Sequence, residues 1–418
     1  MTLACRDCGT LVELPAPDTA GTSYCPVCAH ALRRSAGRGV AAALACALTT
    51  FALLWPANLL PMMGVTMLGM HTQSGIFTSV QALWDGHWVI IAVLTALFVM
   101  VLPFVRFGLL SGVLLCVKAG RRPRWLGRAF RWSLWLDHWA MPDVFLIGCL
   151  VGYSRVRAFL PTTIEAGGWC VIAAALIAMI TRASLDTHAV WHWIETDRTP
   201  PADQPAIACA ACSLVLPAAR QGHRCPRCGL RLRARKPHAT TRTAMFVIAG
   251  LILYLPANFF PMNVDIQMGQ ITPHRIADGI QDLINAHLWW LAVLIFVTSI
   301  AIPALKLLGL TWFLFSIRRR SRRHLRLKTR LYRVINEIGR WSNVDVFTVA
   351  VFLPLIQFGA LAHTDVAVGS VAFMLVVVCT MVASRAFDPR LMWDAALEAP
   401  NMHASARNES PPQAEYAS

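Results

Sequence analysis

The sequence predicts an all-α polytopic membrane protein with about eight transmembrane helices in two homologous four-helix halves, together with two small cysteine-rich β domains. Three observations support this fold class. Hydrophobic residues make up 56% of the 418 residues and charged residues only 14%, which is too little charge for a soluble protein of this length. Long apolar segments recur along the chain, and four C-x-x-C pairs lie outside them.

An internal duplication relates the two halves. The segment 55–62 contains Pro-Ala-Asn-x-x-Pro-Met, and the same motif returns 200 residues later in 255–262. With a further shift of two residues, the segment 139–145 matches 341–347. A repeat of this length predicts that both halves fold alike.

Each half contains four apolar segments. Most have close to the 17–25 residues that cross a bilayer core, and the second of each half is longer and has a central proline. They run over about 39–61, 88–117, 142–160 and 167–183 in the first half, and over about 243–262, 288–317, 344–361 and 366–385 in the second. We expect the last two segments of each half to form helical hairpins, separated by 161–168 and by 363–365.

Basic residues indicate which loops face the cytoplasm. Lys and Arg gather after the second apolar segment of each half, at 118–131 and at 318–333, whereas loop 63–86 has none. Because cytoplasmic loops are enriched in Lys and Arg, we expect both termini and both cysteine modules on the cytoplasmic side of the membrane. The net charge of +16 follows from this bias, so we expect no nucleic-acid partner. The polar start of the chain predicts no cleavable signal peptide.

Eight of the thirteen cysteines form two modules of paired C-x-x-C turns. Two such turns bring four thiolates to one tetrahedral point, which is typical of a structural Zn²⁺ site in a zinc ribbon. The predicted ligands are Cys5, Cys8, Cys25 and Cys28 in module one, and Cys209, Cys212, Cys225 and Cys228 in module two. Iron is the main alternative metal, and a reducing cytosol argues against disulfides. Four protein ligands leave no open position for catalysis, so we expect no enzymatic site there.

These observations divide the chain into five parts. We expect the first zinc ribbon over 1–38 and the first membrane half over 39–183. A linker over 184–242 contains the second ribbon at 209–232, the second membrane half covers 243–398, and the tail 399–418 has a composition typical of disorder.

The second span of each half carries a cation three residues after its central proline. A cation at this depth costs at least ~2.5 kcal/mol, so it is usually paired or faces a wet cavity. The predicted network consists of Arg106, Asp143, Lys306, Asp345, Asn58 and Asn258. One hypothesis is a proton relay or substrate gate between the halves. The other is a static ion pair, or side chains that snorkel to the cytoplasmic face.

With these motifs the chain resembles the paraquat-inducible protein A family. The resemblance is carried by the paired C-x-x-C modules, the duplicated Pro-Ala-Asn-x-x-Pro-Met, the Val-Asp-Val-Phe element at 344–347 and the Phe-Asp-Pro-Arg-Leu-Met-Trp ending at 387–393. It covers nearly the whole chain. It implies a Gram-negative inner-membrane protein that works with a periplasmic MCE-domain partner to move phospholipids between the two membranes.

The resemblance also implies roles for residues. The eight paired cysteines would be the zinc ligands, and Lys306, Asp345, Arg106 and Asp143 would form the polar network. The first half departs from the family pattern at 141–143 and at 185–188, so we expect the second half to be the more functional one.

Three hypotheses for function remain open from the sequence. The leading one is a lipid transporter or loader, and because no Walker A motif is present, its energy would come from a proton gradient, a separate ATPase or the lipid gradient. The second is a non-transporting membrane scaffold that anchors an MCE protein. The third is a metal-based stress or redox sensor.

Overall fold

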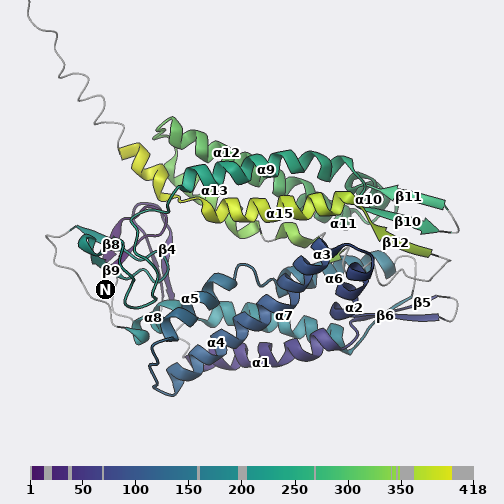
Figure 1. Ribbon diagram of the computed structural model, residues 1–418, viewed down its shortest axis with the longest axis horizontal. Coiled ribbons are helices and arrows are strands. Elements are labelled where there is room, and N and C mark those ends of the chain that lie inside the picture. Colours follow the sequence, from purple (N-terminus) through teal and green to yellow (C-terminus); the bar gives the residue numbers. More distant parts are fainter. Residues whose placement is uncertain are drawn as a thin grey trace, which may run out of the picture.

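Two helical bundles lie side by side, with the cysteine modules at one end and small β-sheets at the other (Figure 1). The computed structural model describes residues 2–13, 21–35, 40–67, 70–157, 161–195, 205–267, 270–339, 341–344, 347–348 and 362–397. The predicted tail 399–418 lies outside these residues. The predicted span 344–361 also lies outside them, apart from residues 344, 347 and 348.

Six helices of the described part of the chain are long and apolar enough to cross a membrane. In the first half these are α1 (Val40–Leu59), the continuous helix Val89–Lys118 and α7 (Ala166–Ser184). In the second half they are α9 (Ala239–Phe259), the continuous helix Trp289–Arg318 and α15 (Val368–Ala386). The predicted third span becomes α6 (Pro142–Arg157), whose apolar part is shorter.

The second span of each half contains a turn of π-helix before its proline. In the first half, α3 (Val89–Thr95), η1 (Ala96–Val101) and α4 (Leu102–Lys118) form one helix. In the second, α11 (Trp289–Ile295), η3 (Phe296–Ala301) and α12 (Ile302–Arg318) repeat this arrangement. Pro103 and Pro303 have no N–H to donate, and the widened turn directly before each of them accommodates this loss. At its end Leu102 N donates to Leu97 O, five residues back.

Amphipathic helices flank the spans at both ends of the bundles. At the end with the sheets these are α2 (Ile76–Asp85) and α10 (Ile276–Asn285). At the end with the cysteine modules they are α5 (Leu126–Leu136), α8 (Thr187–Ile194) and α13 (Leu325–Ile338). Since α5 and α13 each follow a basic loop, they occupy equivalent places in the two halves.

Each half has one three-stranded antiparallel sheet, which the sequence analysis did not predict. The first contains β5 (Met63–Met67) between β6 (Met70–Ser74) and β7 (Thr162–Ile164). The second contains β10 (Asn263–Gln267) between β11 (Gln270–His274) and β12 (Ala362–Val366). Met63 pairs with both Ser74 and Ile164. The connection between the last two spans therefore holds a strand, because Thr-Thr-Ile is β-branched and favours extended backbone.

Short hairpins carry the cysteine modules. Module one has β1 (Thr2–Ala4) paired with β2 (Leu11–Glu13), and β3 (Gly21–Tyr24) paired with β4 (Ala31–Ser35). Module two has β8 (Ala206–Ala208) paired with β9 (Val215–Pro217), followed by an isolated bridge between Arg224 and Arg231. Hairpins this short bury little apolar surface of their own, so a metal held by their cysteines would stabilise them.

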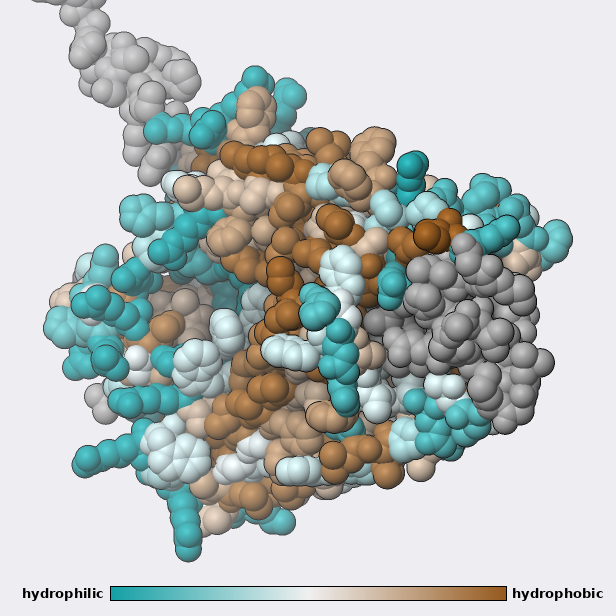
Figure 2. Space-filling view, turned by 45° about the vertical axis from the view of Figure 1, so that its right-hand side comes forward, coloured by the Kyte–Doolittle hydropathy of each residue, from teal (hydrophilic) through white to brown (hydrophobic). Residues whose placement is uncertain are grey.

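One hydrophobic core joins the two halves near the sheets. Phe145 of α6 and Phe347 of the second half meet edge to face, with ring centroids 5.7 Å apart. Thr348 Oγ1 donates to Gly148 O over 3.3 Å, which adds a polar contact between the halves. On the surface, hydrophobic side chains form a band between two hydrophilic ends (Figure 2). Ile252, Phe259 and Leu308 are each more than 60% exposed, as expected of side chains that face lipid.

Candidate functional site

Module one brings four thiols together from two tight turns. Cys5 Sγ lies 3.4 Å from Cys28 Sγ, and Cys8 Sγ lies 3.6 Å from Cys25 Sγ. The first turn is closed by hydrogen bonds from Cys5 N to Thr10 O and from Gly9 N to Cys5 O. Gly9 has a φ of 81°, which a glycine adopts without strain.

Module two repeats this geometry with deeper burial. Cys209 Sγ lies 3.5 Å from Cys228 Sγ, and Cys212 Sγ lies 3.6 Å from Cys225 Sγ. In both modules all four sulfurs lie within 4.8 Å of one another. A tetrahedral Zn²⁺ with bonds of about 2.3 Å has sulfurs about 3.8 Å apart, so the donor set fits such an ion. Ferrous iron prefers the same donors, so geometry alone does not distinguish the two metals.

Charged groups surround module one. Asp7 lies two residues after Cys5. Its carboxylate binds His30 Nδ1 at 3.0 Å and Arg333 Nε at 2.5 Å. Burial raises the pKa of Asp7, but the hydrogen bonds and charges of His30 and Arg333 outweigh burial, so this pKa lies below its usual value. Asp7 is therefore ionised at neutral pH and fixes the module to α13.

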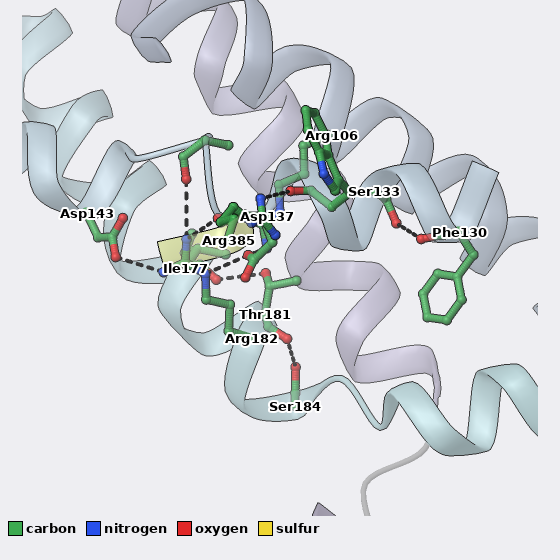
Figure 3. Close-up of polar contacts among 12 residues, drawn as sticks. Arg106, Phe130, Ser133, Asp137, Asp143, Ile177, Thr181, Arg182, Ser184 and Arg385 are labelled. Carbon is green, nitrogen blue, oxygen red and sulfur yellow. Dashed lines mark hydrogen bonds and ion pairs between the residues drawn. The ribbon is translucent and has the colours of Figure 1, made fainter. Parts of the chain in front are cut away.

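Four charged side chains form a chain in the first membrane half (Figure 3). Arg106, which is 3% exposed on α4, forms an ion pair with Asp137. Arg182 of α7 donates from Nε to Asp137 Oδ1 over 2.8 Å and from Nη1 to Asp143 Oδ2 over 2.7 Å. The structure thus brings the predicted residues Arg106 and Asp143 into one network through Asp137 and Arg182, which the sequence analysis did not single out. Arg385 of α15 donates to Trp135 O beside this network.

The corresponding site in the second half holds a buried cation with neutral acceptors. Lys306 is 1% exposed and donates to Gly339 O over 3.1 Å and to Thr380 Oγ1 over 3.0 Å. Within the described residues these are its hydrogen bonds, whereas the predicted Asp345 lies outside them. The offset that relates Trp139 to Trp341 places Gly339 where the first half has Asp137. A neutral carbonyl therefore replaces a carboxylate as the acceptor.

The two predicted asparagines lie apart from these networks. Asn58 Nδ2 donates to Leu54 O over 2.7 Å, and Asn258 Nδ2 donates to Tyr254 O over 2.8 Å. Each therefore bonds within the last turns of its own helix, at the end near the sheets. Among the described residues, no hydrogen bond joins either asparagine to Arg106 or Lys306.

A family model for paraquat-inducible protein A matches residues 40–195 and 240–396, which correspond to the two membrane halves. The chain belongs to the paraquat-inducible protein A family. Module one and the cysteines of module two lie outside both matched ranges.

Curated relatives match along nearly the whole chain. The intermembrane transport protein PqiA of Escherichia coli K12 is 28% identical over 94% of this chain and 95% of its own length. The lipophilic envelope-spanning tunnel protein A of the same strain is 26% identical over 94% and 91%. A probable intermembrane transport protein of Haemophilus influenzae is 24% identical over 94% and 95%. No solved structure matches the chain.

In this paraquat-inducible protein A family member, a groove lies between α12 and α13. Its volume is about 330 Å³, and its lining is apolar apart from Lys306. Leu305, Trp312 and Val334 border it and are each more than 40% exposed. The groove can therefore take an apolar chain from the surrounding lipid.

A second cavity of about 420 Å³ lies at the end of the first half that carries the cysteine modules. It is bordered by module one, by the end of α7 and by the start of α8, and Arg6, Arg182 and His188 are among its lining residues. Burial lowers the pKa of His188, and Arg6 lowers it further. Polar residues therefore line a cavity next to Arg182, which is a member of the first-half network.

The Phe-Asp-Pro-Arg ending of the family member has a structural role. Asp388 accepts hydrogen bonds from Arg390 Nε and Nη2 over 2.9 and 2.8 Å, and from the backbone N–H of Lys236 over 3.2 Å. Burial raises the pKa of Asp388, but Arg390 and Lys236 outweigh burial and hold the pKa below its usual value. The residues that follow module two are thereby tied to the end of α15.

Proposed function

We propose that this multi-pass membrane protein is the inner-membrane component of a lipid transport system. It would pass phospholipid between the inner membrane and a periplasmic partner with an MCE domain, and so maintain the outer membrane. The observation that carries this proposal is the apolar groove between α12 and α13, which has the buried residue Lys306 in its lining. The names of the relatives, intermembrane transport protein and envelope-spanning tunnel protein, agree with it.

The groove suits one acyl chain rather than a polar solute. Apolar side chains border it, and water gains few hydrogen bonds there. The run of arginines at 318–326 joins the end of α12 to the start of α13, and it would face the cytoplasm and hold an anionic headgroup. We therefore place lipid entry at the cytoplasmic leaflet of the second half.

We propose that proton movement drives transfer, through Lys306 and Asp345 in the second half. The first-half network of Arg106, Asp137, Arg182 and Asp143 would be its structural counterpart. Its ion pairs balance two cations with two carboxylates, whereas Lys306 meets neutral acceptors among the described residues.

Both metal modules would bind Zn²⁺ and face the cytoplasm, as the distribution of basic loops predicts. The zinc ions would fold the modules and take no part in chemistry, because four thiolates fill the coordination sphere. Metal analysis of the purified protein tests this assignment. Iron in place of zinc would instead favour the sensor hypothesis.

Lipid transfer between two reconstituted membranes, with the MCE partner present, tests the proposed function. Val334→Trp fills the groove and should lower the initial transfer rate at least about tenfold, whereas Val93→Trp, an exposed position on α3, should leave it unchanged. Lys306→Met keeps the packing and removes the amine, so it should abolish any dependence on a proton gradient. Unchanged transfer by Val334→Trp and Lys306→Met, with no lipid copurifying in native mass spectrometry, would support the scaffold hypothesis instead.

A further inference from the structure

The two metal modules are docked crosswise. Arg131 of α5, in the first half, donates from Nη1 to Cys228 O of module two over 3.0 Å. Arg333 of α13, in the second half, donates from Nη2 to Cys28 O of module one over 2.8 Å. The two arginines are equivalent under the offset that relates Trp139 to Trp341, and each binds the carbonyl of the fourth cysteine of a module. Each module therefore precedes one half in the chain and is bound by an arginine of the other half.

Apolar packing repeats the crosswise pattern. Trp191 of α8 is 2% exposed and shares a hydrophobic cluster with the cysteines of module two. Trp393, its equivalent after α15, packs against the hydrophobic cluster that contains the cysteines of module one. At Gly127 of α5, an added Cβ would overlap Arg227 O of module two, so the helix and the module touch backbone to backbone.

The same two helices present the acceptors of the buried cations. α5 ends at Leu136, and Asp137 directly after it pairs with Arg106. α13 ends at Ile338, and Gly339 directly after it accepts from Lys306. In both halves, the group that binds the cation lies six positions after the arginine that holds a module. A helix of this length is stiff, so displacing one end displaces the other.

We propose that each metal module supports, from the opposite half, the helix that positions the acceptor of the buried cation. Metal in module one holds α13 and thereby the site of Lys306. Metal in module two holds α5 and thereby Asp137 and Arg106. The carbonyls of Cys28 and Cys228 face the arginines only while the metal keeps the knuckle turns folded. Loss of metal from one module should therefore loosen a helix in the other half. This inference concerns how the membrane sites are held, and it does not depend on the transported molecule.

Cysteine alkylation followed by peptide mass spectrometry tests the crosswise support in the full-length, metal-loaded protein. Arg333→Ala should raise the alkylation rate of Cys25 and Cys28 about tenfold, because it removes a charge-assisted hydrogen bond, and should leave module two at the wild-type rate. Arg131→Ala should do the reverse, to Cys225 and Cys228.

Matched controls are available on or next to the same helices. Arg330→Ala on α13 and Arg124→Ala before α5 remove exposed arginines for which the structure gives no contact to either module, so neither should change any rate. If each arginine variant instead affects both modules equally, or affects the module of its own repeat, the proposal is wrong.

Hydrogen exchange of the backbone amides tests the second link. A chelator added to the folded protein removes metal from both modules, so it should raise exchange several-fold across both 325–339 and 126–137. Cys25→Ser in module one should raise exchange across 325–339 and leave 126–137 unchanged. Cys225→Ser should have the opposite selectivity. The chelator acts on wild-type protein that has already folded. Its result therefore remains informative even if a cysteine variant fails to fold. Equal exchange in both helices after metal loss from one module would overturn the proposal.

Discussion

The carboxylate of Asp137 accepts a hydrogen bond of 2.8 Å from Nε of Arg182, while its ion pair with Arg106 joins a second helix to the same group. One carboxylate at the end of α5 thus holds α4 and α7 together. Since Arg106 is almost fully buried, its charge depends on this partner more than an exposed pair would.

Asp137→Ala should lower the stability of the protein strongly. It leaves a buried guanidinium without its carboxylate, which typically costs about 3–5 kcal/mol. Thermal unfolding in detergent, followed by tryptophan fluorescence, should show a clear fall in the apparent melting temperature. Asp85→Ala, at the exposed last residue of α2, should unfold at the wild-type temperature. A wild-type melting temperature for Asp137→Ala would show that the network is not structural.

Metal content should follow the cysteine modules. The purified chain should carry two metal ions, one for each cluster of four cysteines. Cys225→Ser should remove one of them and Cys170→Ser, in the apolar part of α7, should remove none. Elemental analysis by mass spectrometry measures both. Retention of two ions by Cys225→Ser would contradict the assigned ligand set.

Gly127→Ala should disturb the seat of module two. The added methyl group overlaps Arg227 O, and overpacking of this kind costs roughly 1–3 kcal/mol. We expect faster limited proteolysis of 205–235 in this variant. The comparison is Gly112→Ala on α4, where the described residues leave open space for a Cβ and the helix gains up to about 1 kcal/mol. Equal proteolysis of the two variants would contradict backbone contact at Gly127.

The tie between Asp388 and Lys236 should persist into mild acid. The pKa of Asp388 is depressed in the folded protein, so its contribution to stability is present above the unfolded pKa of 3.8 and is lost as the pH falls through the lower folded value. Asp388→Asn should therefore be less stable than wild type at pH 7 and at pH 5 by a similar margin. Thermal unfolding at the two pH values measures this difference. A margin that already vanishes at pH 5 would mean that the pKa is not depressed.

The membrane spans could be predicted from the sequence because runs of about twenty consecutive apolar residues are rare in proteins that do not cross a bilayer. The predicted segment 167–183 corresponds to α7, and 366–385 corresponds to α15. The sheets could not be predicted in the same way. Their strands have three to five residues, and β5 pairs with a strand about one hundred residues away in the chain. Such pairing depends on how the spans bring their ends together.

Residues of the charged network could be predicted only where both halves have a charged residue at equivalent positions. Arg106 has Lys306 at its equivalent position, so the repeat drew attention to it. Asp137 and Arg182 have Gly339 and Ser384 as equivalents, so comparison of the halves gave no sign of a charge pair there. A lone arginine near the end of the apolar segment 167–183 was the available signal. The crosswise docking had no signal at all, because it depends on contacts between segments about one hundred to three hundred residues apart.

The two halves both have a wide helical turn, before Pro103 and before Pro303, although their side chains differ there. The six residues of η1 share no identity with the six of η3, yet both turns have the same length and stand at the same distance from the proline. Side chains can therefore change freely at this point while the backbone path is retained. The position of a single proline, rather than a set of packed neighbours, decides where each long span changes from α-helix to π-helix.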